Sequence, residues 1–146
     1  MNSRLTAKPV AIAADHRGFP LKERLKMWLR AHDYAVADCG TDSPAERVDA
    51  MDYALALVAE SGSGSGQMMA ITSNRFPFMR SALLHTTSEA ALAREHGDVN
   101  MLAIGADTID ATTAEQLLGT FLTTAASGDR YAARRERLAR LDISKL

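Results

Sequence analysis

Cysteine is almost absent from this chain, and its scarcity excludes two kinds of architecture. The only thiol, Cys39, cannot form a disulfide within the chain. A structural zinc site would need a dense group of other ligands, and the histidines are scattered at His16, His32, His85 and His96. We therefore expect neither a disulfide framework nor a metal site, and no feature of the sequence requires a cofactor.

Long apolar runs and an excess of charge of either sign are also missing. No apolar run is long enough to cross a bilayer, and the first residues, MNSRLTAKP, contain no apolar signal core. The formal net charge is −1, so the chain as a whole has no field that would attract nucleic acid or anionic lipid. These absences predict a cytoplasmic protein that binds neither nucleic acid nor a membrane.

The length and composition that are present are typical of one globular domain. The chain has 146 residues, of which 47% are hydrophobic and 24% are charged. Such a chain can bury one core and is short for two domains of ordinary size. We therefore expect a single domain over residues 1–146.

The chain begins with a strand-like segment followed by a helix-like one. Residues 10–14 form a short apolar run that ends in a turn before Gly18, as expected of a buried strand. A helix then begins near Pro20, which suits a first helical turn. Its apolar face consists of Leu21, Leu25, Trp28 and Leu29.

This alternation continues through the rest of the chain. Further strands are expected at residues 34–37, 68–72, 81–84 and 101–104. Further helices are expected around an apolar stripe of Met51, Leu55 and Val58, over residues 88–94, after Thr112 and after Asp129. Strands separated by helices predict an α/β fold, a Rossmann-like doubly wound parallel sheet of about five strands with helices on both faces.

Three boundaries between these elements carry signals of their own. Thr112 and Glu115 have the spacing of a capping box, and Asp129 is placed to cap the last, arginine-rich helix. Residues 61–66 alternate serine and glycine. Their length suits a connection from a helix to a strand, so we interpret them as a loop within one domain.

Ligands of doubly wound sheets bind beyond the carboxyl ends of the strands. The segments to inspect are therefore Asp15, residues 39–42, residues 72–74 and residues 105–107. Asp15-His16 admits two interpretations, because His16 could transfer protons or bind phosphate, or Asp15 could merely cap a turn. His96 is equally explained as a residue at the C-terminal end of a helix.

The arginines of the last helix also have two explanations. Arg130, Arg134 and Arg137 share one helical face, and guanidinium groups so spaced can hold a phosphate. The alternative is a basic helix in solvent, balanced by Asp129 and Glu136. Binding of nucleic acid by these arginines ranks last, because no aromatic residues are interleaved with them.

Taken together, these segments resemble the RpiB/LacA/LacB family, which comprises ribose-5-phosphate isomerase B and the two subunits of galactose-6-phosphate isomerase. The similar segments are residues 11–18 with Leu21-Lys22, residues 38–41, Asp49 with Tyr53-Ala54, residues 93–96 with Asn100, Leu102 and Gly105, and residues 128–134. Their order and spacing cover nearly the whole chain. No single motif carries the resemblance alone.

Members of this family are aldose-ketose isomerases that open a sugar ring and move a proton between C1 and C2 through an enediolate. The resemblance implies a phosphorylated sugar as substrate and an active site between two subunits. A homodimer or homotetramer is expected, because the arginine-rich helix and the apolar residues 76–79 are both typical of surfaces covered by a neighbour. By position, Asp15 would contact the sugar and His96 would assist ring opening. The residues implied in binding the substrate and its phosphate are His16, Asn74, Asn100, Arg130 and Arg134.

The sequence also departs from the family. A strand at residues 68–72 would lead almost directly into Asn74, which leaves no room for the family's Gly-Thr/Ser-Gly-x-Gly loop, whose amides stabilise the enediolate. That loop is therefore expected to be deleted. Asp107 replaces an arginine and would repel phosphate. Cys39 follows a different strand from the family's catalytic cysteine and is expected to pack.

Two functions remain open on this basis. The chain is either a divergent isomerase whose base comes from Asp15, Asp42 or a partner subunit, or a non-catalytic companion subunit or sugar-phosphate-binding protein. A deleted loop predicts negligible turnover unless a paralogue that bears the loop assembles with the chain. If the chain does turn over alone, its oxyanion site is expected at Thr72, Ser73 and Asn74. An unrelated flavodoxin-like binding protein ranks last, because no nucleotide-binding loop is present.

Overall fold

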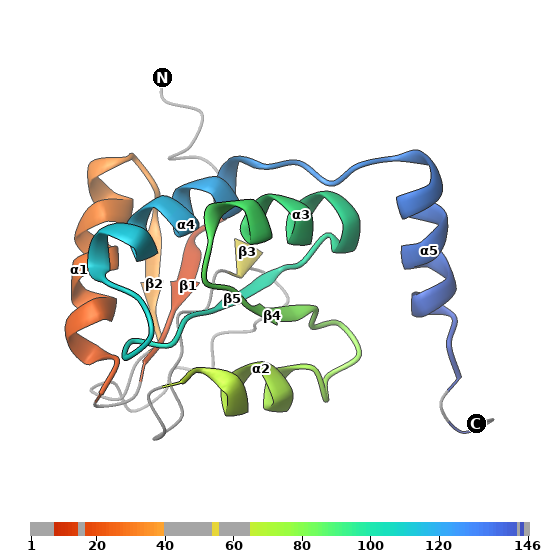
Figure 1. The fold of residues 1–146 in the computed structure, drawn as a ribbon, viewed down its shortest axis with the longest axis horizontal. Helices are drawn as coiled ribbons and strands as arrows, with labels where there is room; N and C mark the ends of the chain where they lie inside the picture. The colour runs from red at the N-terminus through yellow and green to blue at the C-terminus, as the bar shows by residue number, and fades with distance from the viewer. Residues whose placement is uncertain (1–7, 15–16, 40–53, 56–64, 143, 145–146) are drawn as a thin grey trace.

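A computed structural model describes residues 8–14, 17–39, 54–55, 65–142 and 144 of the chain (Figure 1). The elements follow in the order β1 (Val10–Ile12), α1 (Phe19–Ala31), β2 (Val36–Asp38), β3 (Ala54–Leu55), α2 (Gln67–Ser73), β4 (Ser81–Leu83), α3 (Thr87–Gly97), β5 (Met101–Ala103), α4 (Ala111–Thr123) and α5 (Asp129–Ala139). None of the helices described is long and apolar enough to cross a membrane.

All the strand pairs are parallel. β1 lies between β2 and β3, with Val10 opposite both Val36 and Ala54, and β4 pairs with β5, with Ser81 opposite Met101. Helices α3 and α4 lie on one side of the β4–β5 pair and α2 lies on the other (Figure 1). The predicted α/β class is thus confirmed, and the described strands form a three-stranded and a two-stranded sheet.

The core forms where α1 and α4 pack against the strands. All of β1 and β5 is buried, which explains why these strands read as unbroken apolar runs. The leucines that repeat along α1 point inward as their spacing predicts, and α4 adds its own buried face. The buried side chains of the two helices include Leu21, Leu25, Leu29, Leu117, Leu118 and Phe121.

The prediction of a strand at residues 68–72 is wrong, because these residues belong to helix α2. Met68 and Ile71 are 51% and 57% exposed, so the apolar run is not buried as a central strand would be. A short apolar run fits a strand and a helix equally well by periodicity alone. Gly66, at φ 72°, turns the chain into the helix, and only glycine adopts that backbone conformation without strain.

The helix predicted around Met51, Leu55 and Val58 is also wrong in part, since Ala54–Leu55 is strand β3. The other residues of that predicted helix lie outside the described residues. The pairing of β3 with β1 decides its conformation, and no local pattern announces that pairing.

Helix starts differ from those predicted. At α4 the cap is Asp110 and not Thr112, because the Asp110 carboxylate accepts a hydrogen bond of 2.8 Å from the amide of Thr113. This hydrogen bond, together with one from the hydroxyl of Thr113, lowers the pKa of Asp110. The capping box is found instead at α3, between Thr86 and Glu89, and Gly128 occupies the cap position of α5 that was expected for Asp129.

A buried lysine holds the start of α1 against the end of β2. The side chain of Lys22 is 2% exposed, and its ammonium lies 3.0 Å from the carboxylate of Asp38, which Lys26 also contacts. The ring of Phe19 lies 5.0 Å from the same ammonium. The Asp38 carboxylate thus compensates a charge that has almost no access to water.

Replacing Asp38 with alanine should destabilise the fold by about 3 kcal/mol, because it leaves the Lys22 charge buried without its main partner. Lys22→Met removes that charge and should cost clearly less, since a methionine of similar shape needs no counterion. Urea unfolding of both variants measures the difference in the free energy of unfolding. Equal losses for the two variants would contradict the assignment of Lys22 as a compensated buried charge.

Candidate active site

The segment before α2 and the turn after β5 meet through two glycines. A Cβ added at Gly66 would lie 3.0 Å from the carbonyl carbon of Ile104, and one added at Gly105 would lie 2.7 Å from the carbonyl oxygen of Ser65. Neither position has room for a side chain, because backbone approaches backbone. Ser65 and Gly66 are thereby held at the carboxyl end of β5, the edge where ligands of such sheets bind.

The structure removes the reason for expecting that the glycine-rich loop is deleted. That expectation depended on a strand at residues 68–72, and the structure has helix α2 there. The sequence directly before α2, residues 62–66, reads Gly-Ser-Gly-Ser-Gly and has the form Gly-Thr/Ser-Gly-x-Gly. Its last two residues, Ser65 and Gly66, are the ones packed against Gly105. Residues 62–64 lie outside the described residues.

An ion pair spans the same edge. The guanidinium of Arg17, in the turn after β1, lies 2.5 Å from the carboxylate of Asp107, in the turn after β5. Thr108 fixes the second turn, since its amide and hydroxyl donate hydrogen bonds of 3.0 and 2.8 Å to the carbonyl of Gly105. Asp107 therefore presents a charge that is paired with Arg17, and the expectation that it repels phosphate stays a prediction.

Three predicted residues of this edge, Asp15, His16 and Asp42, lie outside the described residues. The turn after β1 is represented there by Arg17, a residue for which the sequence predicted no role. Cys39 follows β2, and its amide donates a 2.8 Å hydrogen bond to the carbonyl of Ile12. Cys39 is exposed, so the expectation that it packs is wrong. Partial desolvation nevertheless raises the pKa of its thiol, and the charge of Asp38 acts in the same direction. A raised pKa makes this thiol a weak nucleophile at neutral pH.

Thr72, Ser73 and Asn74 lie at the C-terminal end of α2 and not at the carboxyl end of a strand. The hydroxyl of Ser73 donates to the carbonyl of Met69 at 2.7 Å. The Asn74 side chain accepts from the amide of Ser81 and donates to its carbonyl, at 2.8 and 2.9 Å. The reason for predicting an oxyanion site at these three residues therefore no longer holds.

The side chain of Asn100, like that of Asn74, forms hydrogen bonds with backbone groups. Its side chain accepts a 2.8 Å hydrogen bond from the amide of Arg80 and donates one of 2.9 Å to the carbonyl of Phe78. Asn74 and Asn100 thus fix the connection between α2 and β4 from two sides. This connection lies at the amino ends of β4 and β5, opposite the edge that carries Gly66 and Gly105.

His96 and two of the predicted arginines do come together. The ring of His96, in the last turn of α3, stacks on Tyr131 with centroids 4.0 Å apart and planes 7° apart. The guanidinium carbons of Arg130 and Arg134 lie 4.9 and 5.7 Å from the centre of the same tyrosine ring. We call His96, Arg130, Tyr131 and Arg134 the arginine face. Its cations could hold an anionic group.

Arg135, which does not belong to the helical face predicted for Arg130, Arg134 and Arg137, holds the arginine face in place. Arg135 donates hydrogen bonds of 2.7 Å to the carbonyl of Ser127 and 3.1 Å to that of His96. It ties α5 to the end of α3, whereas no residue of α5 is buried. Sequence reasoning missed both Arg135 and Tyr131, since helical spacing shows which side chains share a face but not what that face contacts.

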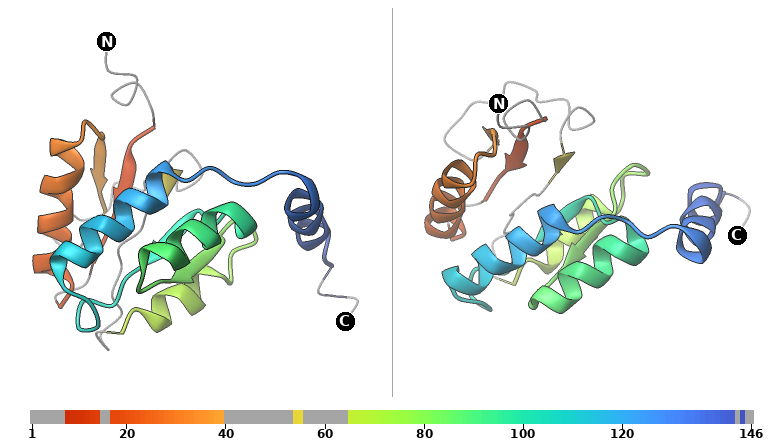
Figure 2. Two further views of the ribbon diagram at one scale, coloured as in Figure 1. Left: turned by 45° about the horizontal axis from the view of Figure 1, so that its top comes forward. Right: turned by 90° about the horizontal axis from the view of Figure 1, so that it is seen from above.

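The arginine face and the glycine contact lie far apart in one chain. Helix α5 contacts the end of α3 and lies at the end of the molecule opposite the start of α1 and the turn after β5 (Figure 2). One copy of the chain therefore does not bring all the predicted residues to one place.

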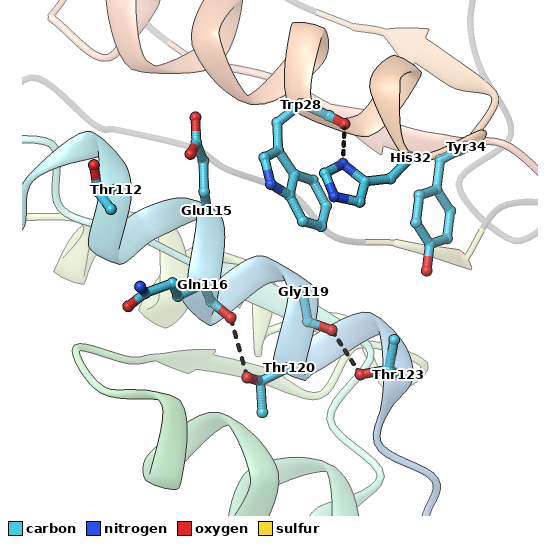
Figure 3. Close-up of a pocket in the computed structure, with 9 residues that line it drawn as sticks. All are labelled: Trp28, His32, Tyr34, Thr112, Glu115, Gln116, Gly119, Thr120 and Thr123. Atoms are coloured by element: carbon cyan, nitrogen blue, oxygen red, sulfur yellow. Dashed lines mark hydrogen bonds between the residues drawn. The ribbon is translucent and has the colours of Figure 1, made fainter.

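Two hollows occur elsewhere on the described surface. One of about 580 Å³ lies between α1 and α4, where Trp28 stacks on His32 with ring centroids 3.9 Å apart (Figure 3). Another of about 900 Å³ lies beneath α5, beside Arg80, Arg135 and Leu138. Among the described residues, no group of His, Cys, Asp or Glu side chains is placed to hold a metal ion.

Comparisons with known proteins show which sequences and folds this chain resembles. The chain is 30% identical to ribose-5-phosphate isomerase B of Escherichia coli K12 over 145 residues, 92% of this chain and 97% of that protein. The solved structure of ribose 5-phosphate isomerase B from Anaplasma phagocytophilum superposes with a TM-score of 0.77 at 37% identity, covering 90% of this chain and 97% of that one. Residues 10–138 match the Ribose/Galactose Isomerase family, and the chain belongs to that family.

Proposed function

We propose that this protein is an aldose-ketose isomerase whose substrate is a phosphorylated sugar. The observation that carries the proposal is the contact of Ser65 and Gly66 with Gly105, which brings the end of the glycine-rich segment to the carboxyl edge of the sheet. The relatives that share this fold include ribose-5-phosphate isomerase B enzymes. Ribose 5-phosphate is therefore the first substrate to test.

The reaction needs a base and hydrogen-bond donors at one place. A base takes the proton from C2 of the open-chain aldose, and negative charge develops on the oxygen at C1, which gives an enediolate. The protonated base then returns this proton to C1, while the proton of the C2 hydroxyl passes to the oxygen at C1, so that a ketone forms at C2 and a hydroxyl at C1. Amides of the segment that ends at Gly66 supply donors for the developing charge, and one such donor contributes about 2.7 to 4 kcal/mol. We assign the base to Asp15, beside the phosphate-binding His16.

A second copy of the chain completes this site. His96, Arg130 and Arg134 belong to the last turn of α3 and to α5, which lie at the opposite end of the molecule from the turn after β5, so these residues serve the edge of a neighbouring subunit and not their own. A two-fold axis then creates two equivalent sites. We therefore propose a homodimer, or a homotetramer built from such dimers. Because the glycine-rich segment is present, neither a loop-bearing paralogue nor a merely companion role is needed.

Mixing two inactive variants tests this arrangement. Asp15→Asn and His96→Ala should each abolish turnover of ribose 5-phosphate, since each damages both sites of a dimer. Subunits exchanged between the two should regain about a quarter of the parent activity, because half of the dimers then hold one intact site. Coupled assays of ribulose 5-phosphate formation measure the recovery.

Two results would contradict the proposal. An assembled parent protein without activity on ribose, allose or galactose phosphates would remove the proposed function. Activity in the parent but no recovery after exchange, with native mass spectrometry showing mixed dimers, would place His96 and Asp15 in the same subunit's site.

A further inference from the structure

The pair Arg17–Asp107, which we call the clasp, is an ion pair at the surface. Its side chains are 47% and 49% exposed, so water reaches both charges. Exposed pairs of this kind contribute little to folding. An anion that arrives from solvent therefore competes with Asp107 for Arg17 at small cost.

The backbone around the clasp places Arg17 and Asp107 at the carboxyl ends of β1 and β5. Asp107 lies two residues after Gly105, in the turn that Thr108 closes. Arg17 directly precedes Gly18, the residue at which α1 begins. The clasp thus joins the turns after β1 and β5 at the edge where Gly66 packs against Gly105.

We propose that Arg17 binds the substrate's phosphate and that Asp107 is a competitor for it within the fold. This inference rests on the proposed function, because it requires a phosphorylated substrate at this edge. A phosphate dianion carries more negative charge than a carboxylate and also offers a bidentate arrangement of oxygens, so it displaces Asp107 from the guanidinium. Asp107 then keeps Arg17 in place between turnovers and sets the affinity for phosphate.

Substitutions at the two positions should act in opposite directions. Asp107→Asn removes the competitor, and the Kd for inorganic phosphate and the KM for ribose 5-phosphate should each fall about fivefold. Arg17→Met removes the ligand, and both constants should rise at least about tenfold. The kcat should change little in Asp107→Asn. Calorimetry gives the Kd, and initial rates separate KM from kcat.

The pair Arg24–Glu115 provides the matched control. It joins α1 to α4 with a nitrogen to oxygen distance of 2.6 Å, and Arg24 is 50% exposed. Glu115→Gln breaks an ion pair of the same kind away from the glycine contact and should leave both constants unchanged. A similar fall in this variant would show a general effect of net charge and would overturn the assignment to Asp107.

If the clasp only holds the two turns together, Asp107→Asn and Arg17→Met should weaken binding alike, and that outcome rejects the proposal. Unchanged constants in both variants reject it as well. If Arg17→Met also lowers the thermal midpoint, its weaker binding could come from damage to the fold. Asp107→Asn then distinguishes the two explanations, because loss of a purely structural carboxylate cannot tighten phosphate binding. Absence of binding and turnover in the parent protein would instead remove the proposed function.

Discussion

Replacing Gly105 with alanine should destabilise the protein by about 2 to 3 kcal/mol and abolish its isomerase activity. The added Cβ would lie 2.7 Å from the carbonyl oxygen of Ser65 and 2.7 Å from the hydroxyl of Thr108. The first of these is a backbone atom and cannot rotate away. The chain must therefore move the glycine-rich segment off the end of β5, which removes donors from the place where the enediolate forms.

Urea unfolding and the rate of ribose 5-phosphate isomerisation measure the two effects. Gly128→Ala is the control, because a Cβ added at Gly128 has no atom within 4 Å. That variant should retain the stability of the parent protein. If Gly105→Ala kept full activity, the contact between Gly105 and Ser65 would have no part in catalysis, and the observation that carries the proposed function would fail.

The double substitution Arg130→Met and Arg134→Met should lower kcat/KM for the phosphorylated sugar by about three orders of magnitude. Hydrogen bonds to a charged group contribute about 1.5 to 3 kcal/mol each, and two guanidinium groups are lost together. Both arginines lie beside Tyr131 on a helix that has no buried residue. The subunit should therefore still fold, since these side chains are not part of its core.

Arg140→Met supplies the control for this experiment. Arg140 follows the same helix, is 82% exposed and lies 3.8 Å from Glu136. Its replacement removes one positive charge and should leave kcat/KM unchanged. Calorimetry with inorganic phosphate separates binding from chemistry. If the double variant bound phosphate as tightly as the parent protein, the arginine face would not be an anion site.

Much of the architecture followed from the sequence alone. The unbroken apolar runs at β1 and β5 and the leucine spacing of α1 are local patterns with one physical explanation each, and the structure confirms all three. The alternation of such patterns led to parallel strands, because short connections through helices permit little else. The resemblance carried by many short motifs led to the family, which the comparisons confirm.

Elements without a distinctive local pattern were decided by their surroundings. Residues 68–72 are apolar over a length that suits either a strand or a helical turn, and Ala54–Leu55 became a strand only by pairing with β1. The error at residues 68–72 mattered for function, since it made the glycine-rich loop appear to be missing. One wrong element thus changed the expected chemistry of the whole protein.

The sequence by itself therefore determined the fold class, the family and the residue types available for binding a sugar phosphate. Only the tertiary structure decided which of those residues meet. Gly66 and Gly105 touch, and Arg17 reaches Asp107, through contacts between segments distant in the sequence. His96 and the arginines of α5 gather at the other end of the molecule. Such contacts depend on how sheets and helices pack in space. A periodicity along the chain shows which side chains share a face, but it does not show which distant segments meet.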